Sequence, residues 1–203
     1  MKVLVTGFDP FGGESVNPSF EAVKLLPDSL EGHSVHKLEL PTVFGKGAQL
    51  LEWEIRRLRP EIVLCTGQAG GRKGITAEQV AINLRCCTLA DNEGNVLAPC
   101  PVVPGGPDAY FTRLPIETIL SDLKDAGVPS GRSLSAGSFV CNDVMYSLLH
   151  LIAADFPAVM GGFVHVPYIP SQVAGKDVPA MELDEIEKAL EIILRACIRA
   201  YGQ

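Results

Sequence analysis

The sequence predicts an α/β fold, a single domain in which a mostly parallel central sheet carries helices on both faces. Two observations predict it. Short apolar segments rich in β-branched residues alternate along the chain with segments of helical periodicity, which is typical of strands joined by crossover helices. No repeat, low-complexity tract or linker-like stretch divides residues 1–203, so we expect one domain.

The first elements lead from a buried strand through a loop and a helix to a second strand. Lys2–Thr6 is short, apolar and β-branched and ends at Gly7, as expected for a buried strand. A Gly/Pro loop follows, and then a short helix around Ser19–Leu26. Ser34–Leu40 alternates in polarity and ends at Pro41, which indicates another strand.

The middle of the chain continues the alternation. Lys46–Leu58 places its apolar residues on one helical face, and Glu61–Thr66 is an apolar strand that ends at Gly67. Gln79–Leu84 is a candidate strand, and Ile116–Ala126 is a predicted helix followed by glycine.

The last third holds two helices around one strand. Asn142–Ala154 is apolar almost all round, which predicts a largely buried helix. Gly162–Val166 is a strand closed by Pro167. Leu183–Ile198 has apolar residues at alternating spacings of three and four, with acidic residues in its first turn and arginines in its last. In sheets of this class, ligands usually bind at the carboxyl ends of the strands.

Composition excludes several functional classes. The chain is 47% hydrophobic and 20% charged, so it has the apolar surface that disordered chains lack. Its net charge of −7 argues against a nucleic-acid partner, because an acidic surface repels phosphates. The most apolar stretch, Met145–Phe163, is interrupted by polar residues and proline, so we expect no membrane span.

The N-terminal residues and the cysteines bear on localisation. MKVLVTGFDPFGG runs into a Gly/Pro turn without a cleavage site, so we do not expect a signal peptide. Six cysteines in a chain of 203 residues are too few for a disulfide scaffold and are expected to be reduced. The expected location is therefore the cytoplasm.

The loop after the first strand contains two phenylalanines between glycines and a proline. It lacks the Lys and Ser/Thr of a phosphate-binding loop, since Gly13 and Glu14 occupy those positions. Phe8 and Phe11 are either anchors of the loop in the core or two walls of an apolar ligand slot.

Three further residues have side chains suited to nucleophilic catalysis. Cys141 stands at the start of a predicted helix, where the dipole and free N–H groups stabilise a thiolate and an oxyanion. His165 lies at the end of an apolar strand, and Glu78 follows a glycine-rich loop and is expected to open an apolar strand. Each also has a structural interpretation: a buried cysteine, a hydrogen-bonded core histidine and a surface carboxylate. Cys86 and Cys87 lack metal-ligand spacing.

Four separated motifs select between these interpretations. They are TGFDPFGG at the N-terminus, GQAGG–R–IT–E–VAIN around Glu78, SAG-SFVCN around Cys141 and GGFVHVPYIP around His165. Together, and in this order over nearly the whole chain, they closely resemble pyroglutamyl peptidase I, a family of cytosolic cysteine peptidases that remove an N-terminal pyroglutamyl residue. The resemblance implies that Cys141 is the nucleophile, that His165 is the general base and acid, and that Glu78 orients the imidazole.

The same resemblance implies a substrate pocket. Phe8 and Phe11 match the aromatic side chains that grip the lactam ring, and Gln68 matches the glutamine that hydrogen-bonds the ring amide. Thr42 and Val140 match positions near the ring. The implied substrates are pyroglutamyl peptides. No metal or organic cofactor is expected, and the implied assembly is a homotetramer of domains with a twisted sheet.

Two positions depart from the family pattern, and two other functions compete with it. Gln79 stands where Lys or Arg is usual, and Thr88 stands where an arginine is common. A related hydrolase or phosphorylase would act on another small substrate, but the phosphate loop is missing. A catalytically silent ligand-binding protein is disfavoured because Glu78, Cys141 and His165 are all present.

Overall fold

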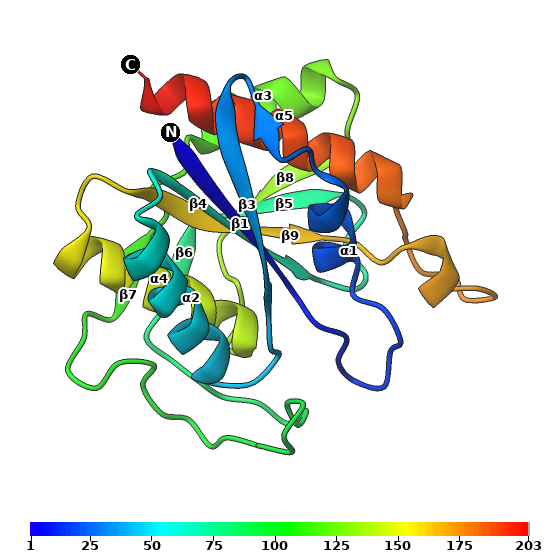
Figure 1. The fold of residues 1–203 in the computed structure, drawn as a ribbon. Coiled ribbons are helices and arrows are strands. Elements are labelled where there is room, and N and C mark those ends of the chain that lie inside the picture. The colour runs from blue at the N-terminus through cyan, green and yellow to red at the C-terminus, as the bar shows by residue number, and fades with distance from the viewer. Residues whose placement is uncertain (203) are drawn as a thin grey trace.

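The computed structural model describes residues 1–202 and has a seven-stranded central sheet (Figure 1). The strand order is β2-β3-β1-β4-β9-β5-β8, and β1, β3, β4 and β9 run parallel. The strands β2 and β5 pair antiparallel to their neighbours β3 and β9. The bounds of these strands are β1 Lys2–Phe8, β2 Ser29–Leu30, β3 His33–Leu40, β4 Ile62–Gln68, β5 Ile75–Glu78, β8 Ser130–Ser133 and β9 Met160–Val166. The prediction of a mostly parallel sheet is confirmed.

Helices cover both faces of the sheet, as predicted (Figure 1). One face packs against α1, α3 and α5, and the other against α2 and α4, so each face has its own apolar core. A short 3₁₀ helix, η1, follows β9. The bounds are α1 Pro18–Leu25, α2 Lys46–Leu58, α3 Ile116–Asp125, α4 Val140–Asp155, η1 Pro170–Gln172 and α5 Leu183–Tyr201.

Local sequence explains where the helices begin and end. Asn17 caps α1 by accepting a hydrogen bond from the Ser19 N–H, and Pro18 takes the first helical position, where its missing N–H costs nothing. The helix α2 ends at Arg59 in the left-handed conformation. The helix α4 is buried along most of its length because its residues are apolar almost all round.

The prediction of a strand over Gln79–Leu84 is wrong in its bounds and in its sheet. Glu78 is the last residue of β5 rather than the opening of an apolar strand, and β6 spans only Val80–Ile82. That strand pairs with β7, Ala109–Phe111, in a separate two-stranded sheet. Neither β5 nor β8 is predicted from the sequence, because both are short and mix apolar with polar residues.

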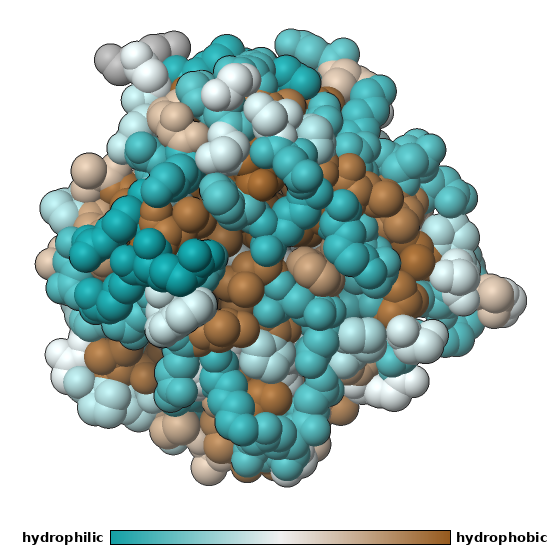
Figure 2. All heavy atoms as spheres, viewed as in Figure 1, coloured by the Kyte–Doolittle hydropathy of each residue, from teal (hydrophilic) through white to brown (hydrophobic). Residues whose placement is uncertain are grey.

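The surface seen in Figure 2 is mostly hydrophilic, with apolar residues in scattered patches. Across residues 1–202, none of the helices combines the length and the apolar character that crossing a membrane requires. In the same part of the chain, no three His, Cys, Asp or Glu side chains gather closely enough to hold a metal ion.

Candidate active site

The predicted site residues gather where the central strands end. Gly67 of β4 pairs with His165 of β9. Thr6, two residues before the end of β1, pairs with Cys65 of β4. This register brings Phe8, Gly67 and His165 into one row across the carboxyl ends of three parallel strands. The candidate residues therefore lie where ligands usually bind in sheets of this class.

Cys141 lies directly against this row. A methyl group added to Gly67 would lie 2.9 Å from Cys141 Sγ and 2.8 Å from Cζ of Phe163, both far below normal contact. Only a glycine leaves room for the sulfur over β4. Since Gly67 is paired with His165, the cysteine and the histidine approach the same point of the sheet from α4 and β9.

His165 and Glu78 form a buried hydrogen bond. His165 Nδ1 lies 2.7 Å from Glu78 Oε1, and the two residues are 4% and 0% exposed. A carboxylate can only accept a hydrogen bond, so Nδ1 carries the proton and Nε2 is left with its lone pair. The structure therefore brings together the predicted acid and the predicted base in the tautomer that can take a proton from a thiol.

Arg72 is a fourth ionisable group at this site, and its role is not predicted from the sequence. Its Nη1 lies 2.6 Å from Glu78 Oε1 and also donates to the Thr76 hydroxyl. Arg72 is only partly exposed, so its charge acts on the buried carboxylate through little water. The sequence does give one signal for a role of Arg72, namely its position two residues after Gly70 in the loop that leads to Glu78.

The environment favours the neutral histidine and the protonated cysteine. Burial lowers the pKa of His165 below its usual value, against the opposing effect of Glu78. Burial and the negative charge of Glu78 raise the pKa of Cys141 to about 12, while the Arg72 charge lowers it. Burial also raises the pKa of Glu78, but the hydrogen bonds and charges of His165 and Arg72 outweigh it, so the net pKa is lowered.

The start of α4 supplies backbone donors beside the sulfur. The helix begins at Val140, and its first internal hydrogen bond runs from the Asp143 N–H to the Phe139 carbonyl, at 3.1 Å. The N–H groups before Asp143 have no partner inside the helix. The amide of Asn142 holds this end in place, because it bonds both backbone groups of Ile82.

The two phenylalanines of the first loop have different environments. Phe8 is 2% exposed and packs in the core, with its ring 6.3 Å from that of Phe163. Phe11 is half-buried, and its ring lies 6.1 Å from that of Phe139. Phe44 meets the same Phe139 ring edge-on at 5.3 Å. Phe139 and Phe44 thus extend the aromatic surface beyond the two rings that the sequence singled out.

The remaining predicted residues are buried around this surface. The Thr42 N–H donates to Asp9 Oδ1 at 2.7 Å, and its hydroxyl donates to the Asp9 carbonyl at 3.2 Å. Val140 is fully buried at the start of α4. Gln68 is 9% exposed at the end of β4, and its Oε1 accepts a hydrogen bond from Gln172 at 2.8 Å.

The two residues that depart from the family pattern, Gln79 and Thr88, are not part of the candidate catalytic group. Gln79 forms backbone hydrogen bonds with Ser133 and Thr112 and continues the chain from β5 towards β6. Thr88 is exposed. Arg85, three residues earlier, instead pairs with the buried carboxylate of Asp143 in the first turn of α4.

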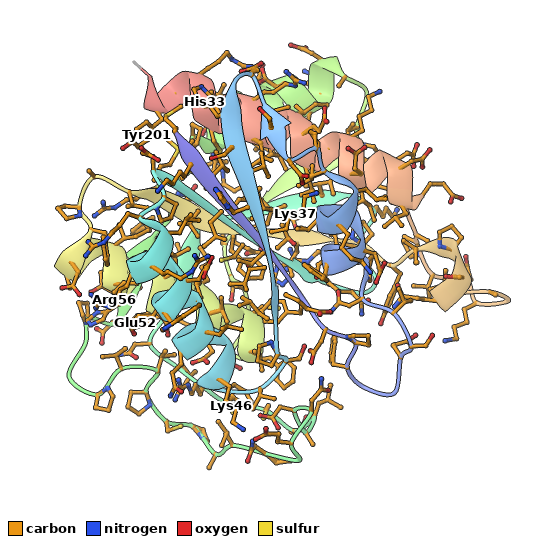
Figure 3. All side chains as sticks on the ribbon, viewed as in Figure 1. His33, Lys37, Lys46, Glu52, Arg56 and Tyr201 are labelled. Atoms are coloured by element: carbon orange, nitrogen blue, oxygen red, sulfur yellow. The ribbon has the colours of Figure 1, made fainter. Side chains whose placement is uncertain are left out.

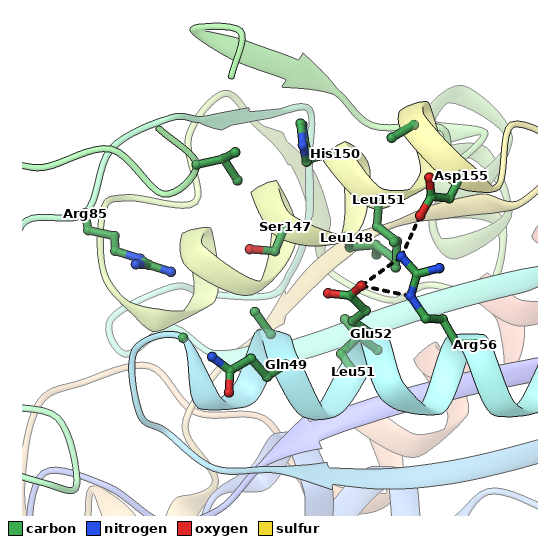
Figure 4. A pocket seen from close by; sticks show the side chains of 14 residues that line it. Gln49, Leu51, Glu52, Arg56, Arg85, Ser147, Leu148, His150, Leu151 and Asp155 are labelled. Carbon is green, nitrogen blue, oxygen red and sulfur yellow. Dashed lines mark hydrogen bonds and ion pairs between the residues drawn. The ribbon is translucent and has the colours of Figure 1, made fainter. Parts of the chain in front are cut away.

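A separate groove of ≈ 340 Å³ lies between α2 and α4 (Figure 4). Arg56 crosses it to reach Asp155 and also holds Glu52 on its own helix, where Figure 3 shows the two side by side. None of the eight predicted site residues lines this groove. The candidate catalytic residues therefore lie at the strand ends and not in this groove.

Comparisons with known proteins agree over almost the full chain. A family model described as pyroglutamyl peptidase matches residues 1–200. A pyrrolidone-carboxylate peptidase of Clostridium botulinum is 50% identical over 199 residues, which cover 98% of this chain and 93% of that protein. One of Thermosipho africanus is 48% identical over 203 residues, covering 100% and 99%.

Solved structures give the same result. The crystal structure of pyroglutamyl peptidase I from Bacillus amyloliquefaciens superposes with a TM-score of 0.94 at 46% identity, covering 100% of this chain and 97% of that one. A mutant pyrrolidone carboxyl peptidase from Pyrococcus furiosus superposes with a TM-score of 0.95 at 39% identity, covering 98% and 99%.

Proposed function

The chain belongs to the pyroglutamyl peptidase family, and we propose that it removes the N-terminal pyroglutamyl residue of peptides by covalent catalysis with Cys141. His165 acts as general base and then general acid, and Glu78 orients its ring and stabilises the imidazolium. Residues 1–203 serve as one peptidase domain. The observation that carries this proposal is the buried 2.7 Å hydrogen bond between His165 Nδ1 and Glu78 Oε1, beside the strand position against which the Cys141 sulfur lies.

The first step is proton transfer coupled to attack. Before the reaction the thiol and the imidazole are both neutral, since the pKa of Cys141 is raised and that of His165 is lowered. His165 Nε2 takes the thiol proton as the sulfur attacks the pyroglutamyl carbonyl carbon, and the carbonyl oxygen becomes an oxyanion. Glu78 stabilises the imidazolium that forms, because it is an ionised carboxylate.

The later steps return the proton and release the acid. The free N–H groups at the start of α4 stabilise the oxyanion. The intermediate collapses, the C–N bond breaks and His165 protonates the leaving amine, which leaves a thioester on Cys141. Water, deprotonated by His165, then attacks the thioester. Pyroglutamate leaves, and the proton returns to the sulfur.

Recognition of the ring depends on shape and amide hydrogen bonding. Pyroglutamate has no free α-amine, so a pocket cannot select it by charge. Phe8 and Phe11 supply apolar walls, Thr42 and Val140 lie near the ring, and Gln68 supplies an amide. A proline ring would leave the Gln68 amide unpaired, which disfavours it.

The proposal includes a reducing location and self-assembly. A cytoplasmic location suits catalysis by a free thiol, and the six cysteines form no disulfide with one another in the structure. The homotetramer is proposed from the family resemblance alone. Light scattering on the purified reduced protein tests the assembly, and a monomeric mass at working concentration would contradict it.

The activity is tested with a pyroglutamyl anilide, using the prolyl anilide as a substrate that lacks the ring carbonyl. The reduced protein is expected to release the chromophore from the first only. Cys141→Ser is expected to abolish release, while Cys100→Ser, at a half-buried position outside the site, keeps it. Absence of turnover by the unsubstituted protein would refute the peptidase assignment, and full activity of Cys141→Ser would refute the nucleophile.

A further inference from the structure

We propose that Ser133 is a positioning residue whose hydroxyl donates to Oε2 of Glu78 when His165 becomes charged, so that the carboxylate stays ionised and in place. The inference rests on the proposed function, because it adds a residue to the machinery of the same reaction. The side chain of Glu78 is fully buried, and its two oxygens differ in their hydrogen bonds.

Only one of the two carboxylate oxygens of Glu78 has hydrogen-bond donors. Oε1 accepts from His165 Nδ1 at 2.7 Å and from Arg72 Nη1 at 2.6 Å. Within residues 1–202, Oε2 is shielded from solvent and accepts no hydrogen bond. An ionised carboxylate can accept at both oxygens, and a buried acceptor without a donor disfavours the charged form. The group that must stabilise the imidazolium therefore has one oxygen left to satisfy.

The sheet places Ser133 next to Glu78. The strand β8 lies at the edge of the sheet beside β5 (Figure 1), and its last residue, Ser133, pairs with Glu78, the last residue of β5. The Gln79 N–H donates to the Ser133 carbonyl at 2.8 Å, which fixes this register. Neighbouring strands lie about 4.8 Å apart, and residues paired in register point their side chains to the same face. The Ser133 hydroxyl and the Glu78 carboxylate therefore share one face of the sheet.

The Ser133 hydroxyl has only a weak partner in its present orientation. It donates to the Ser135 carbonyl at 3.2 Å in an exposed turn, whereas O–H···O bonds are usually about 2.7–2.8 Å long. Rotation about χ1 of Ser133 moves the hydroxyl among three staggered positions. A hydrogen bond to a carboxylate is shorter and stronger than one between neutral groups, so a turn towards Glu78 is favourable.

The charge of Glu78 is sensitive to this neighbour. Burial raises the pKa of Glu78, and Ser133 is among the groups that lower it, after His165. The other ionisable groups that face Glu78 are Arg72 from the preceding loop and Cys141 from α4. When the thiol proton moves to His165, Glu78 must remain ionised beside the imidazolium. A third donor at Oε2 favours that state and opposes transfer of the proton to the carboxylate.

The first test removes the hydroxyl. In Ser133→Ala we expect kcat for the pyroglutamyl anilide to fall about 10-fold with KM unchanged, because Ser133 acts on Glu78 and not on the substrate. Ser133→Thr, which keeps the hydroxyl on a residue that suits a strand, should keep most of the activity. The matched control is Ser130→Ala, the same change at the exposed first residue of β8, which should leave kcat and KM unchanged.

The pH profile reports the same interaction. As pH falls, the pair of His165 and Glu78 takes up one more proton, and His165 can then no longer accept the thiol proton. Without the Ser133 donor the negative pair binds that proton more tightly. The acid limb of kcat/KM in Ser133→Ala should therefore move up by about half a pH unit or more. Titration of the isotope-labelled His165 ring by NMR should show the same upward shift without depending on turnover.

A double-mutant cycle separates an effect through Glu78 from an effect through the segment that leads to Cys141. In the Glu78→Gln background the charged acceptor is gone, so Ser133→Ala should lower kcat less than about 2-fold. An equal loss of about 10-fold in both backgrounds would overturn the inference. Equal losses of kcat and thermal stability with an unmoved acid limb would show a merely structural role and overturn it too.

The remaining outcomes distinguish the inference from the activity. If the wild-type protein hydrolyses the anilide and Ser133→Ala keeps its kcat and its acid limb, the inference is overturned and the peptidase assignment stands. If the wild-type protein gives no turnover, the proposed function fails. The ring titration then decides separately whether Ser133 acts on the pair, and an unshifted His165 titration in Ser133→Ala overturns the inference.

Discussion

His165 Nδ1 and Glu78 Oε1 lie 2.7 Å apart, across 87 residues of sequence and away from solvent. The carboxylate determines that the ring proton sits on Nδ1, and Glu78→Gln lets an amide N–H face that nitrogen and favour the other tautomer. We expect kcat to fall about 10²- to 10⁴-fold with little change in KM. Steady-state kinetics measure this, and Glu78→Asp, which keeps the charge, should lose less. A variant with wild-type kcat would remove Glu78 from the mechanism.

Arg72 is expected to set the acid limb of the pH profile. Its positive charge lowers the pKa of His165, and His165 must be neutral to accept the thiol proton. Removing the charge in Arg72→Met raises that pKa, so activity is lost at a higher pH than in the wild type. The pH dependence of kcat/KM for the pyroglutamyl anilide reports this shift. A limb that stays in place, or moves to lower pH, would contradict it.

Gly67→Ala is expected to damage catalysis through a single methyl group. Its Cβ would lie 2.9 Å from Cys141 Sγ, and the rigid Phe163 ring blocks the other side at 2.8 Å. The sulfur must shift, so we expect kcat/KM to fall about 10- to 100-fold. The matched control is Gly131→Ala in β8, where nothing lies within 4 Å of the added methyl and kcat/KM should be retained. Equal activities of the two variants would refute the packing argument.

Asp91 is expected to stabilise the fold in a pH-dependent way. It accepts backbone hydrogen bonds from Phe44, Glu93 and Asn95. Burial raises its pKa, but these bonds and the Asn95 side chain lower it overall. A lowered folded-state pKa contributes stability above the unfolded value, and this stability is lost as pH falls through the folded value.

Asp91→Asn should therefore cost about 1–3 kcal/mol of unfolding free energy near neutral pH. The cost should shrink as pH falls from about 4, the ordinary pKa at which the unfolded carboxyl protonates, towards the lowered pKa of the folded state. Thermal unfolding of both proteins across this range measures the difference. A loss of unfolding free energy that stays constant down to low pH would show that the loop does not depend on the negative charge of Asp91.

Amphipathic and apolar segments were predictable from the sequence, and sheet edges were not. The bounds Lys46–Leu58 of α2 agree with the prediction because its polar and apolar faces are well separated. The strand β5 has four residues and is defined by pairing with β9 and β8, which are distant in sequence. No local pattern encodes such a partner. Glu78 was consequently placed at the start of a strand rather than at the end of one.

The candidate site was likewise predictable from the sequence only in part. Motif resemblance singled out Cys141, His165 and Glu78. The structure adds the 2.7 Å hydrogen bond between His165 Nδ1 and Glu78 Oε1. The contact of Gln172 with Gln68 was not predictable, because it spans 104 residues and a buried glutamine has no sequence signature of its own. Arg72 was visible in a motif, but its partner was not.

Two consecutive residues at the end of β4 face opposite sides of the sheet, Gly67 towards Cys141 and Gln68 towards Gln172. Substitutions among the apolar residues Ile62–Leu64 of β4 change packing, and a change of volume there can be offset by a neighbour. Losing one residue of β4 is different, because it would turn Gln68 towards the Cys141 sulfur and Ala69 towards Gln172. The length of β4 is therefore expected to vary less among related proteins than the identities of its residues.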